Sequence, residues 1–195
     1  MNTPNHIILA SSSPYRKELL SRILDDFEAL SPDIDETAFP DEEPIELVAR
    51  LAQQKALAIA VNHPDALVIG SDQVCVLNKQ ILGKPGTMDK AIEQLKACSG
   101  HTVTFYTSLC VTNANQTAQN TTVVATKVQF RQLSDKEIVN YLEKEQPFDC
   151  AGSFKCEGLG IVLFEAIESK DPTALIGLPL IALAIKLREF GVELL

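Results

Sequence analysis

The most strongly β-like stretch of this 195-residue chain is Leu67–Leu77, which reads Leu-Val-Ile-Gly-Ser-Asp-Gln-Val-Cys-Val-Leu. Such an apolar run with many β-branched residues predicts a central strand of a sheet. Polar Asp72 and Gln73 nevertheless lie in its middle. Because a carboxylate in a buried strand is costly unless it is paired or binds a metal, Asp72 is a candidate functional residue.

The start of the chain predicts a strand, a serine turn and the beginning of a helix. Ile7–Leu9 form a short apolar run, and serines occupy positions 11–13. Ser13 is a good N-cap, and Pro14 suits the first helical turn. Free N–H groups at such a turn can bind an anion, although serines that merely cap a helix give the same pattern. Arg16 opposes the helix dipole but is a sensible phosphate ligand.

A predicted helix that starts at Pro44 and reaches about Val61 contains a lysine in an unusual position. Lys55 lies within the apolar stripe of this helix, so its ammonium must either extend to solvent or meet a negative partner. Arg50 is predicted on the solvated side. Glu36, in the turn-rich loop before the helix, fits a solvated acidic turn unless a ligand requires it.

Composition limits the classes of partner. A net charge of −9 argues against nucleic-acid binding, and it favours a divalent cation held by carboxylates if the ligand carries phosphates. The five cysteines form no C-x-x-C pair, which disfavours a disulfide framework or a zinc site. No apolar run approaches the ~20 residues of a membrane span, and no signal-peptide pattern is present. We therefore expect a cytoplasmic protein without a membrane partner.

The rest of the chain predicts an alternation of helices and strands. A glycine-containing segment around Gly158 and Gly160 indicates close backbone approach to a ligand, with Lys155 and Glu157 beside it. The expected elements are a helix over 88–98 and a hairpin formed by 102–112 and 123–133. A helix that begins with a capping box at Ser134 and Glu137 should follow to about residue 145, and then a strand over 162–167. The last element is a nearly all-apolar helix over 178–190, which is deeply buried or faces a partner subunit.

Seven short motifs occur in an order and at a spacing that resemble the Maf-like nucleotide pyrophosphatase family over almost the entire chain. They are Leu9-Ala-Ser-Ser-Ser-Pro-Tyr-Arg, Asp35-Glu36, Lys55-Ala56, Gly70-Ser-Asp-Gln-Val, Gly83-Lys84-Pro85, Gly100-His-x-Val and Ala151-Gly-Ser-Phe-Lys-x-Glu-Gly. The resemblance implies hydrolysis of a nucleoside triphosphate between its α and β phosphates, which releases a monophosphate and diphosphate.

Site roles follow from this resemblance together with the chemistry of the residues. Asp72 would act as general base toward the attacking water, and Glu36 with Asp72 would hold Mg²⁺ or Mn²⁺. Whether Asp72 is base, metal ligand or both stays open. The phosphate ligands would be Ser11, Ser13 and Arg16 at the helix start, with Lys55, Lys84 and Lys155 offsetting the developing charge.

The motif variants also imply a substrate. The subfamily that acts on 7-methyl-GTP has an aromatic residue, Gln and Glu at three specificity positions, which here are Tyr15, Gln73 and Glu157. Tyr15 departs from the Trp often found there, but it can still stack on a purine. Methylation at N7 makes guanine positive, so Glu157 would attract it. If Glu157 only accepts hydrogen bonds from the guanine edge, we expect little preference for the methyl group.

Two alternatives remain beside a 7-methyl-GTP pyrophosphatase. One is a family member that hydrolyses dTTP or UTP, and the other is a non-catalytic nucleotide-binding regulator of cell division. The resemblance implies an α/β fold shared with inosine-triphosphate pyrophosphatases, in which helices flank a mixed, elongated and twisted sheet with a cleft between two lobes. We expect one domain over residues 1–195 and a homodimer.

Overall fold

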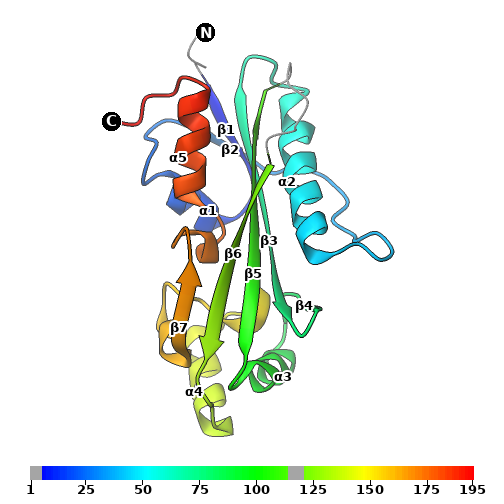
Figure 1. Ribbon diagram of the computed structural model, residues 1–195, viewed down its shortest axis with the longest axis vertical. Coiled ribbons are helices and arrows are strands. Elements are labelled where there is room, and N and C mark those ends of the chain that lie inside the picture. Colours follow the sequence, from blue (N-terminus) through cyan, green and yellow to red (C-terminus); the bar gives the residue numbers. More distant parts are fainter. Residues whose placement is uncertain (1–5, 114–120) are drawn as a thin grey trace. The chain divides into compact units, whose positions relative to one another are not determined.

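A computed structural model of the protein describes residues 6–113 and 121–195 (Figure 1). Its regular elements are β1 (Ile7–Ala10), α1 (Pro14–Leu20), β2 (Glu28–Leu30), α2 (Pro44–Ala60), β3 (Leu67–Leu77), β4 (Gln80–Leu82), α3 (Met88–Cys98), β5 (Thr102–Thr112), β6 (Thr121–Phe130), α4 (Asp135–Glu145), β7 (Phe164–Ser169) and α5 (Leu180–Glu189). Short 3-10 turns occupy Ala151–Ser153, Leu159–Leu163 and Ala174–Ile176.

The strands form one mixed sheet in the order β2-β1-β3-β5-β6-β7, with β4 paired to β3. β1 runs parallel to both β2 and β3, whereas β3–β4 and β6–β7 are antiparallel. The predicted α/β class, a mixed sheet with flanking helices, is therefore confirmed. The cleft between lobes stays a prediction.

The chain divides into two compact units. The first comprises Met1–Gln73, Thr107–Val124 and Asp171–Leu195, and the second comprises Val74–Tyr106 and Ala125–Lys170. Three strands, β3, β5 and β6, contribute residues to both units.

In the first unit, alternate side chains of β1 supply two separate cores. Ile7 and Leu9 pack in a cluster with residues of α1 and α5, whereas Ile8 and Ala10 pack with alanines of α2. Figure 1 accordingly shows α2 and α5 on opposite sides of β1. The period of two along a strand explains why an uninterrupted apolar run is needed here, since both faces of β1 are covered.

Small residues bring α2 close to β3. A Cβ built at Gly70 would lie 2.2 Å from the carbonyl oxygen of Ala52 and 2.9 Å from Ala56 Cβ. A side chain at position 70 would therefore push the helix away from the strand. This close approach sets the spacing between Lys55, which precedes Ala56, and Asp72, two residues after Gly70 on the same face of the strand.

In the second unit, α3 packs against α4, and a cluster of four phenylalanines forms much of the interior. Phe105, Phe130, Phe154 and Phe164 meet edge to face, with ring centroids 4.8 to 5.5 Å apart. This geometry is the favourable one for aromatic pairs. Phe154 thereby anchors the segment that carries Lys155.

One expectation about the last third of the chain needs correction. Residues 162 and 163 belong to a 3-10 turn and not to a strand, because β7 begins only at Phe164. Of the two alternatives for the apolar helix, burial on all sides is excluded within this chain, whereas a face toward a partner subunit stays a prediction. α5 buries Leu183 and Leu187, but Ile181 and Ile185, one turn apart, are about half exposed at 52% and 50%. In the part of the chain that the structure describes, no helix is long and apolar enough to cross a membrane.

Candidate active site

β3 extends beyond the last residue of β1, so the later residues of β3 do not pair with β1. β1 pairs with β3 only as far as Ala10 opposite Gly70, so Ser71, Asp72 and Gln73 extend beyond it. Their side chains alternate between the two faces of the sheet. Asp72 points to the α2 face, whereas Ser71 and Gln73 contact the segment around the 3-10 turn Ala174–Ile176. Ligands of open α/β sheets bind at such carboxyl ends of strands.

Lys55 joins two predicted site residues into one cluster. Its Nζ lies 2.6 Å from Asp72 Oδ1 and 2.8 Å from Glu36 Oε1. Lys55 and Asp72 are only 6% and 7% exposed. Of the two possibilities for Lys55, the structure therefore shows the negative partner. Asp72 is a buried carboxylate with a paired charge, as its position in a central strand requires. Glu36 is exposed on its loop and meets the same ammonium from outside.

A buried serine holds the backbone at Asp72. Ser108 Oγ accepts a hydrogen bond from the Asp72 amide at 3.2 Å and donates one to the Val48 carbonyl at 2.6 Å. This hydroxyl thus connects β5 with both β3 and α2. Ser108 is completely buried, and nothing in the pattern of its strand distinguishes it from a core position, so its role is not visible in the sequence.

The serine turn has the predicted capping geometry. Ser13 is the N-cap of α1, and its hydroxyl accepts a hydrogen bond from the Arg16 amide at 3.4 Å. Ser11 Oγ accepts one from the Ser13 amide at 3.1 Å. Both serines therefore organise the turn through their own side chains. Tyr15 follows Pro14 on α1 and is half-buried.

Arg16 is held by one nitrogen and leaves its other two available. Its Nε donates to the Gly177 carbonyl at 2.8 Å, and Nη1 and Nη2 have no hydrogen-bond partner among the residues that the structure describes. Burial lowers the pKa of Arg16, while the negative charges of Asp72 and Glu36 act to raise it. The guanidinium thus shares an electrostatic environment with the Lys55 cluster.

The amide of Gln73 has a defined orientation. Its Nε2 lies 2.8 Å from Thr107 Oγ1, 2.8 Å from Ala174 O and 3.1 Å from Leu175 O, so its two hydrogens are shared among three acceptors. Because two of these acceptors are backbone carbonyls, the nitrogen must face them. Gln73 Oε1 makes no hydrogen bond within the described residues and is not buried. The amide oxygen can therefore still accept a hydrogen bond.

The other three predicted residues lie in the second unit. Lys84 and Glu157 are exposed, and Lys155 is half-buried. The Lys155 amide donates to Tyr141 Oη at 3.1 Å, and Leu159 N donates to Glu145 Oε2 at 2.9 Å, so α4 holds this segment. Burial raises the pKa of Tyr141.

Contacts within the chain account for the two glycines of that segment. A Cβ at Gly160 would come within 2.2 Å of the Lys155 carbonyl oxygen, and one at Gly158 within 2.8 Å of Glu145 Oε1. The backbone approaches other parts of the protein at these positions. The close approach of the backbone to a ligand beside Lys155 and Glu157 stays a prediction.

Arg50 lies outside the buried face of α2, as expected, but its side chain is only 17% exposed because the loop before the helix covers it. Its guanidinium binds Glu42 at 2.6 and 2.8 Å, donates to Thr37 O at 3.0 Å, and lies 4.1 Å from the centre of the Phe39 ring. The hydrogen bond with Glu42 raises the pKa of Arg50 and lowers that of Glu42 to about 2. Arg50 thereby fastens the loop that carries Glu36 to α2.

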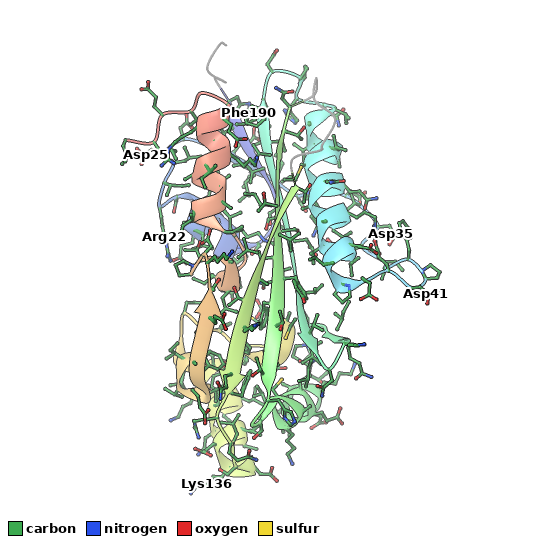
Figure 2. The ribbon with its side chains drawn as sticks, viewed as in Figure 1. Arg22, Asp25, Asp35, Asp41, Lys136 and Phe190 are labelled. Atoms are coloured by element: carbon green, nitrogen blue, oxygen red, sulfur yellow. The ribbon has the colours of Figure 1, made fainter. Side chains whose placement is uncertain are left out.

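This loop stands out in the side-chain view. Figure 2 shows Asp35 beside α2 and Asp41 toward the tip of the loop that precedes the helix. Asp35 Oδ1 accepts a hydrogen bond from the Thr37 amide at 2.9 Å, which closes a turn next to Glu36. Arg50 pairs with Glu42, which lies eight residues earlier and before the helix. Because ion pairs within a helix are spaced three or four residues apart, the sequence contains no signal for this pair.

Two carboxylates of the described residues, those of Glu36 and Asp72, could contribute to a metal site. Within residues 6–113 and 121–195, no group of three or more His, Cys, Asp or Glu side chains is arranged to hold a metal ion. Glu36 and Asp72 nevertheless both direct a carboxylate oxygen at one cation, the Lys55 ammonium. Their oxygens are of the kind that Mg²⁺ and Mn²⁺ prefer.

The motifs and the site geometry agree with a comparison against known families, in which the model for Maf-like proteins matches residues 6–190. The chain belongs to the Maf-like protein family. Among its relatives is a 7-methyl-GTP pyrophosphatase of Aliivibrio fischeri, 55% identical over 97% of this chain and 98% of the relative. Another of that name, from Nitrosococcus oceani, is 54% identical over 98% of this chain and 96% of the relative.

Solved structures support the fold of this Maf-like protein. The HAM1 protein of Coxiella burnetii matches 95% of this chain and 98% of its own, with a TM-score of 0.51 and 13% sequence identity. At that identity the likeness concerns the fold alone.

Proposed function

We propose that this Maf-like protein is a nucleoside triphosphate pyrophosphatase that converts 7-methyl-GTP into 7-methyl-GMP and diphosphate. The observation that carries the proposal is the buried cluster of Asp72 and Lys55 beyond the end of β1, which Glu36 joins from the loop before α2. The names of relatives 53–55% identical over nearly the whole chain support the substrate. We also infer that both units act as one domain.

Asp72 is proposed as the general base. An ionised carboxylate within reach of a water molecule can accept its proton as the water attacks phosphorus. Ser108 fixes the backbone of Asp72, and the close approach of α2 at Gly70 fixes Lys55 against it. Lys55 would then keep the carboxylate oriented and offset negative charge that develops on the phosphate.

A divalent cation fits the same residues. Glu36 and Asp72 would hold Mg²⁺ or Mn²⁺, because their oxygens already converge on one positive group. When bound, such an ion polarises a phosphoryl oxygen and acidifies water. Removing the metal with a chelator should abolish turnover, and Glu36→Gln should weaken Mn²⁺ binding by about tenfold. Electron paramagnetic resonance of free Mn²⁺, recorded without substrate, measures this binding directly.

Phosphate binding is proposed for residues in both units. In the first, Arg16 offers two terminal nitrogens in a fork that matches phosphate oxygens, and Ser11 and Ser13 line the turn before it. In the second, Lys84 and Lys155 have no ion pair among the described residues, so their charges are available.

Base recognition is proposed for Tyr15, Gln73 and Glu157. Gln73 presents an acceptor oxygen, which suits the N–H groups of the guanine edge. Tyr15 would stack on the purine, and a positive methylated ring strengthens such stacking. Glu157, exposed in the second unit, would attract the same positive charge.

The proposal is tested by diphosphate release in Mg²⁺ or Mn²⁺ across 7-methyl-GTP, GTP, dTTP, UTP and CTP. We expect 7-methyl-GTP to be preferred, and Asp72→Asn to lower kcat at least about a hundredfold. The matched control is Asp25→Asn, since Asp25 is an exposed residue outside the site. A preference for dTTP or UTP would still support the pyrophosphatase reaction, but it would contradict the proposed recognition of 7-methylguanine.

Absence of turnover with every triphosphate would instead favour the nucleotide-binding regulator. In that case calorimetry should detect nucleotide binding that Asp72→Asn leaves intact. The family resemblance further supports a homodimer, and sedimentation equilibrium at several protein concentrations distinguishes a dimer from a monomer.

A further inference from the structure

Gln94, a residue of α3 outside every motif discussed above, connects two segments of the second unit. Its Nε2 donates to the Gly83 carbonyl at 3.0 Å, and its Oε1 accepts a hydrogen bond from Ser153 Oγ at 2.5 Å. Gly83 directly precedes Lys84, and Ser153 lies two residues before Lys155. One amide thus ties together the two lysine-bearing segments.

The backbone at Ser153 is in an unusual conformation. Gly152 and Ser153 both have positive φ, at 74° and 64°. A serine in this left-handed region is disfavoured by roughly 1 kcal/mol and persists only where its surroundings hold it. Ser153 is fully buried, and its hydroxyl is directed to Gln94. The Gln94 amide is therefore part of what maintains this turn.

Both lysines sit on backbones that are anchored on each side. Beyond Lys84, the Gly86 amide donates to the Phe148 carbonyl at 3.0 Å, and Pro85 is buried. At Lys155, the amide donates to Tyr141, and the preceding Phe154 is packed in the phenylalanine cluster. Neither ammonium has an ion-pair partner in the described part of the chain. Two positive charges on segments that are hydrogen-bonded to the same side chain suit a polyanion.

We propose that Gln94 is a positioning residue that sets the spacing of Lys84 and Lys155 for the phosphate chain of the substrate. The inference rests on the proposed function, because it takes the phosphates as the ligand of these lysines. Gln94 itself does not touch the substrate. Its loss should weaken binding of the triphosphate and of diphosphate, while the Lys55 and Asp72 cluster in the first unit stays intact.

The test uses Gln94→Met, which keeps the length of the side chain and removes both hydrogen bonds. We expect KM for the triphosphate and the inhibition constant of diphosphate to rise about tenfold, with kcat changed less than about threefold. The matched control is Gln129→Met, because the side chain of Gln129 donates to the exposed Glu165 at 2.7 Å and lies away from both lysine-bearing segments in sequence, so both constants should stay unchanged.

Two further variants separate positioning from stability. Gln94→Glu keeps the acceptor for Ser153 but places a carboxylate against the Gly83 carbonyl, so it should also raise both constants. Ser153→Gly removes the cost of a positive φ at a residue with a side chain. This variant should increase KM and the inhibition constant less than Gln94→Met does. Unchanged KM and inhibition constants in folded Gln94→Glu or Gln94→Met protein would overturn the inference. If the wild-type protein released no diphosphate at all, the proposed function would fail instead.

Discussion

Substitution of Lys55 tests whether its ion pair with the buried Asp72 stabilises the first unit. Its ammonium lies between Asp72 and Glu36, and it is 6% exposed. Lys55→Met would leave a buried carboxylate without its partner, at an expected cost of about 3–5 kcal/mol in the free energy of unfolding. Chemical denaturation monitored by circular dichroism measures this cost.

A double mutant provides the internal check. Because Asp72→Asn removes the charge that Lys55 balances, the combination should cost clearly less than the sum of the single changes. Lys127→Met is the surface control, since Lys127 lies 3.9 Å from a Glu168 that is 82% exposed. Equal effects of Lys55→Met and Lys127→Met would contradict the buried pairing.

Glu42 determines a pH dependence at the residue scale. The hydrogen bond from Arg50 lowers its pKa from 4.5 to about 2 in the folded protein. A carboxyl group with a lowered folded pKa stabilises the protein above its unfolded pKa, and this contribution disappears as the pH falls through the folded value. The contribution of Glu42 is therefore complete above about pH 4.5 and is lost toward about pH 2.

Melting temperatures of the wild-type and Glu42→Gln proteins across this range provide the measurement. Their difference should be constant from about pH 5 to pH 7 and should shrink below pH 4.5. Glu18→Gln serves as a control, because Glu18 forms an exposed i,i+4 pair with Arg22. A Glu42→Gln difference that stays constant down to about pH 2 would refute the assignment.

At the scale of elements, α5 depends on a cap that lies nine residues before its first residue. Its N-cap position is Pro179, whose side chain cannot accept a hydrogen bond. Asp171 Oδ2 accepts one from Ile181 N at 2.7 Å and one from Ala182 N at 3.2 Å. Its Oδ1 binds the Thr173 hydroxyl at 2.8 Å, so one buried carboxylate fixes both the turn and the helix.

Removal of this carboxylate should destabilise the protein strongly. Asp171→Ala is expected to cost about 2–3 kcal/mol, because hydrogen bonds to a charged, buried acceptor are lost. Asp171→Asn keeps part of the acceptor capacity and should cost less. Thr87→Ala, at the ordinary N-cap of α3, should cost only about 1 kcal/mol. Urea denaturation of the three variants ranks them, and Asp171→Ala at or below Thr87→Ala would show that the remote cap contributes little.

At the scale of the whole molecule, the two units share strands. β3, β5 and β6 each contribute residues to both, so unfolding of one unit would break strands that the other needs. We therefore expect a single cooperative transition, with a calorimetric enthalpy equal to the van't Hoff enthalpy. Leu9→Ala in the first unit and Phe130→Ala in the second should lower the same transition. Two resolved transitions, each shifted by one variant, would contradict this expectation.

Local patterns in the sequence determined most of the elements. The apolar run of residues 67–77 and the helix over 88–98 have the bounds expected from periodicity and capping, as do the capping box at Ser134 and the N-cap at Ser13. These features depend on neighbours within a few residues, which is why a single sequence reveals them. The position of the charged Asp72 within an apolar strand is likewise evident from its neighbours in the sequence.

The partners of the charged and polar side chains were decided only by the tertiary structure. Lys55 and Asp72 are separated by 17 positions in the chain, whereas Gln94 and Ser153 are separated by 59. Asp171 and the start of α5 meet because the intervening turn folds back. Hydrogen bonds and ion pairs of this kind form after packing has set the distance between elements, so periodicity, which describes one element at a time, contains no information about them.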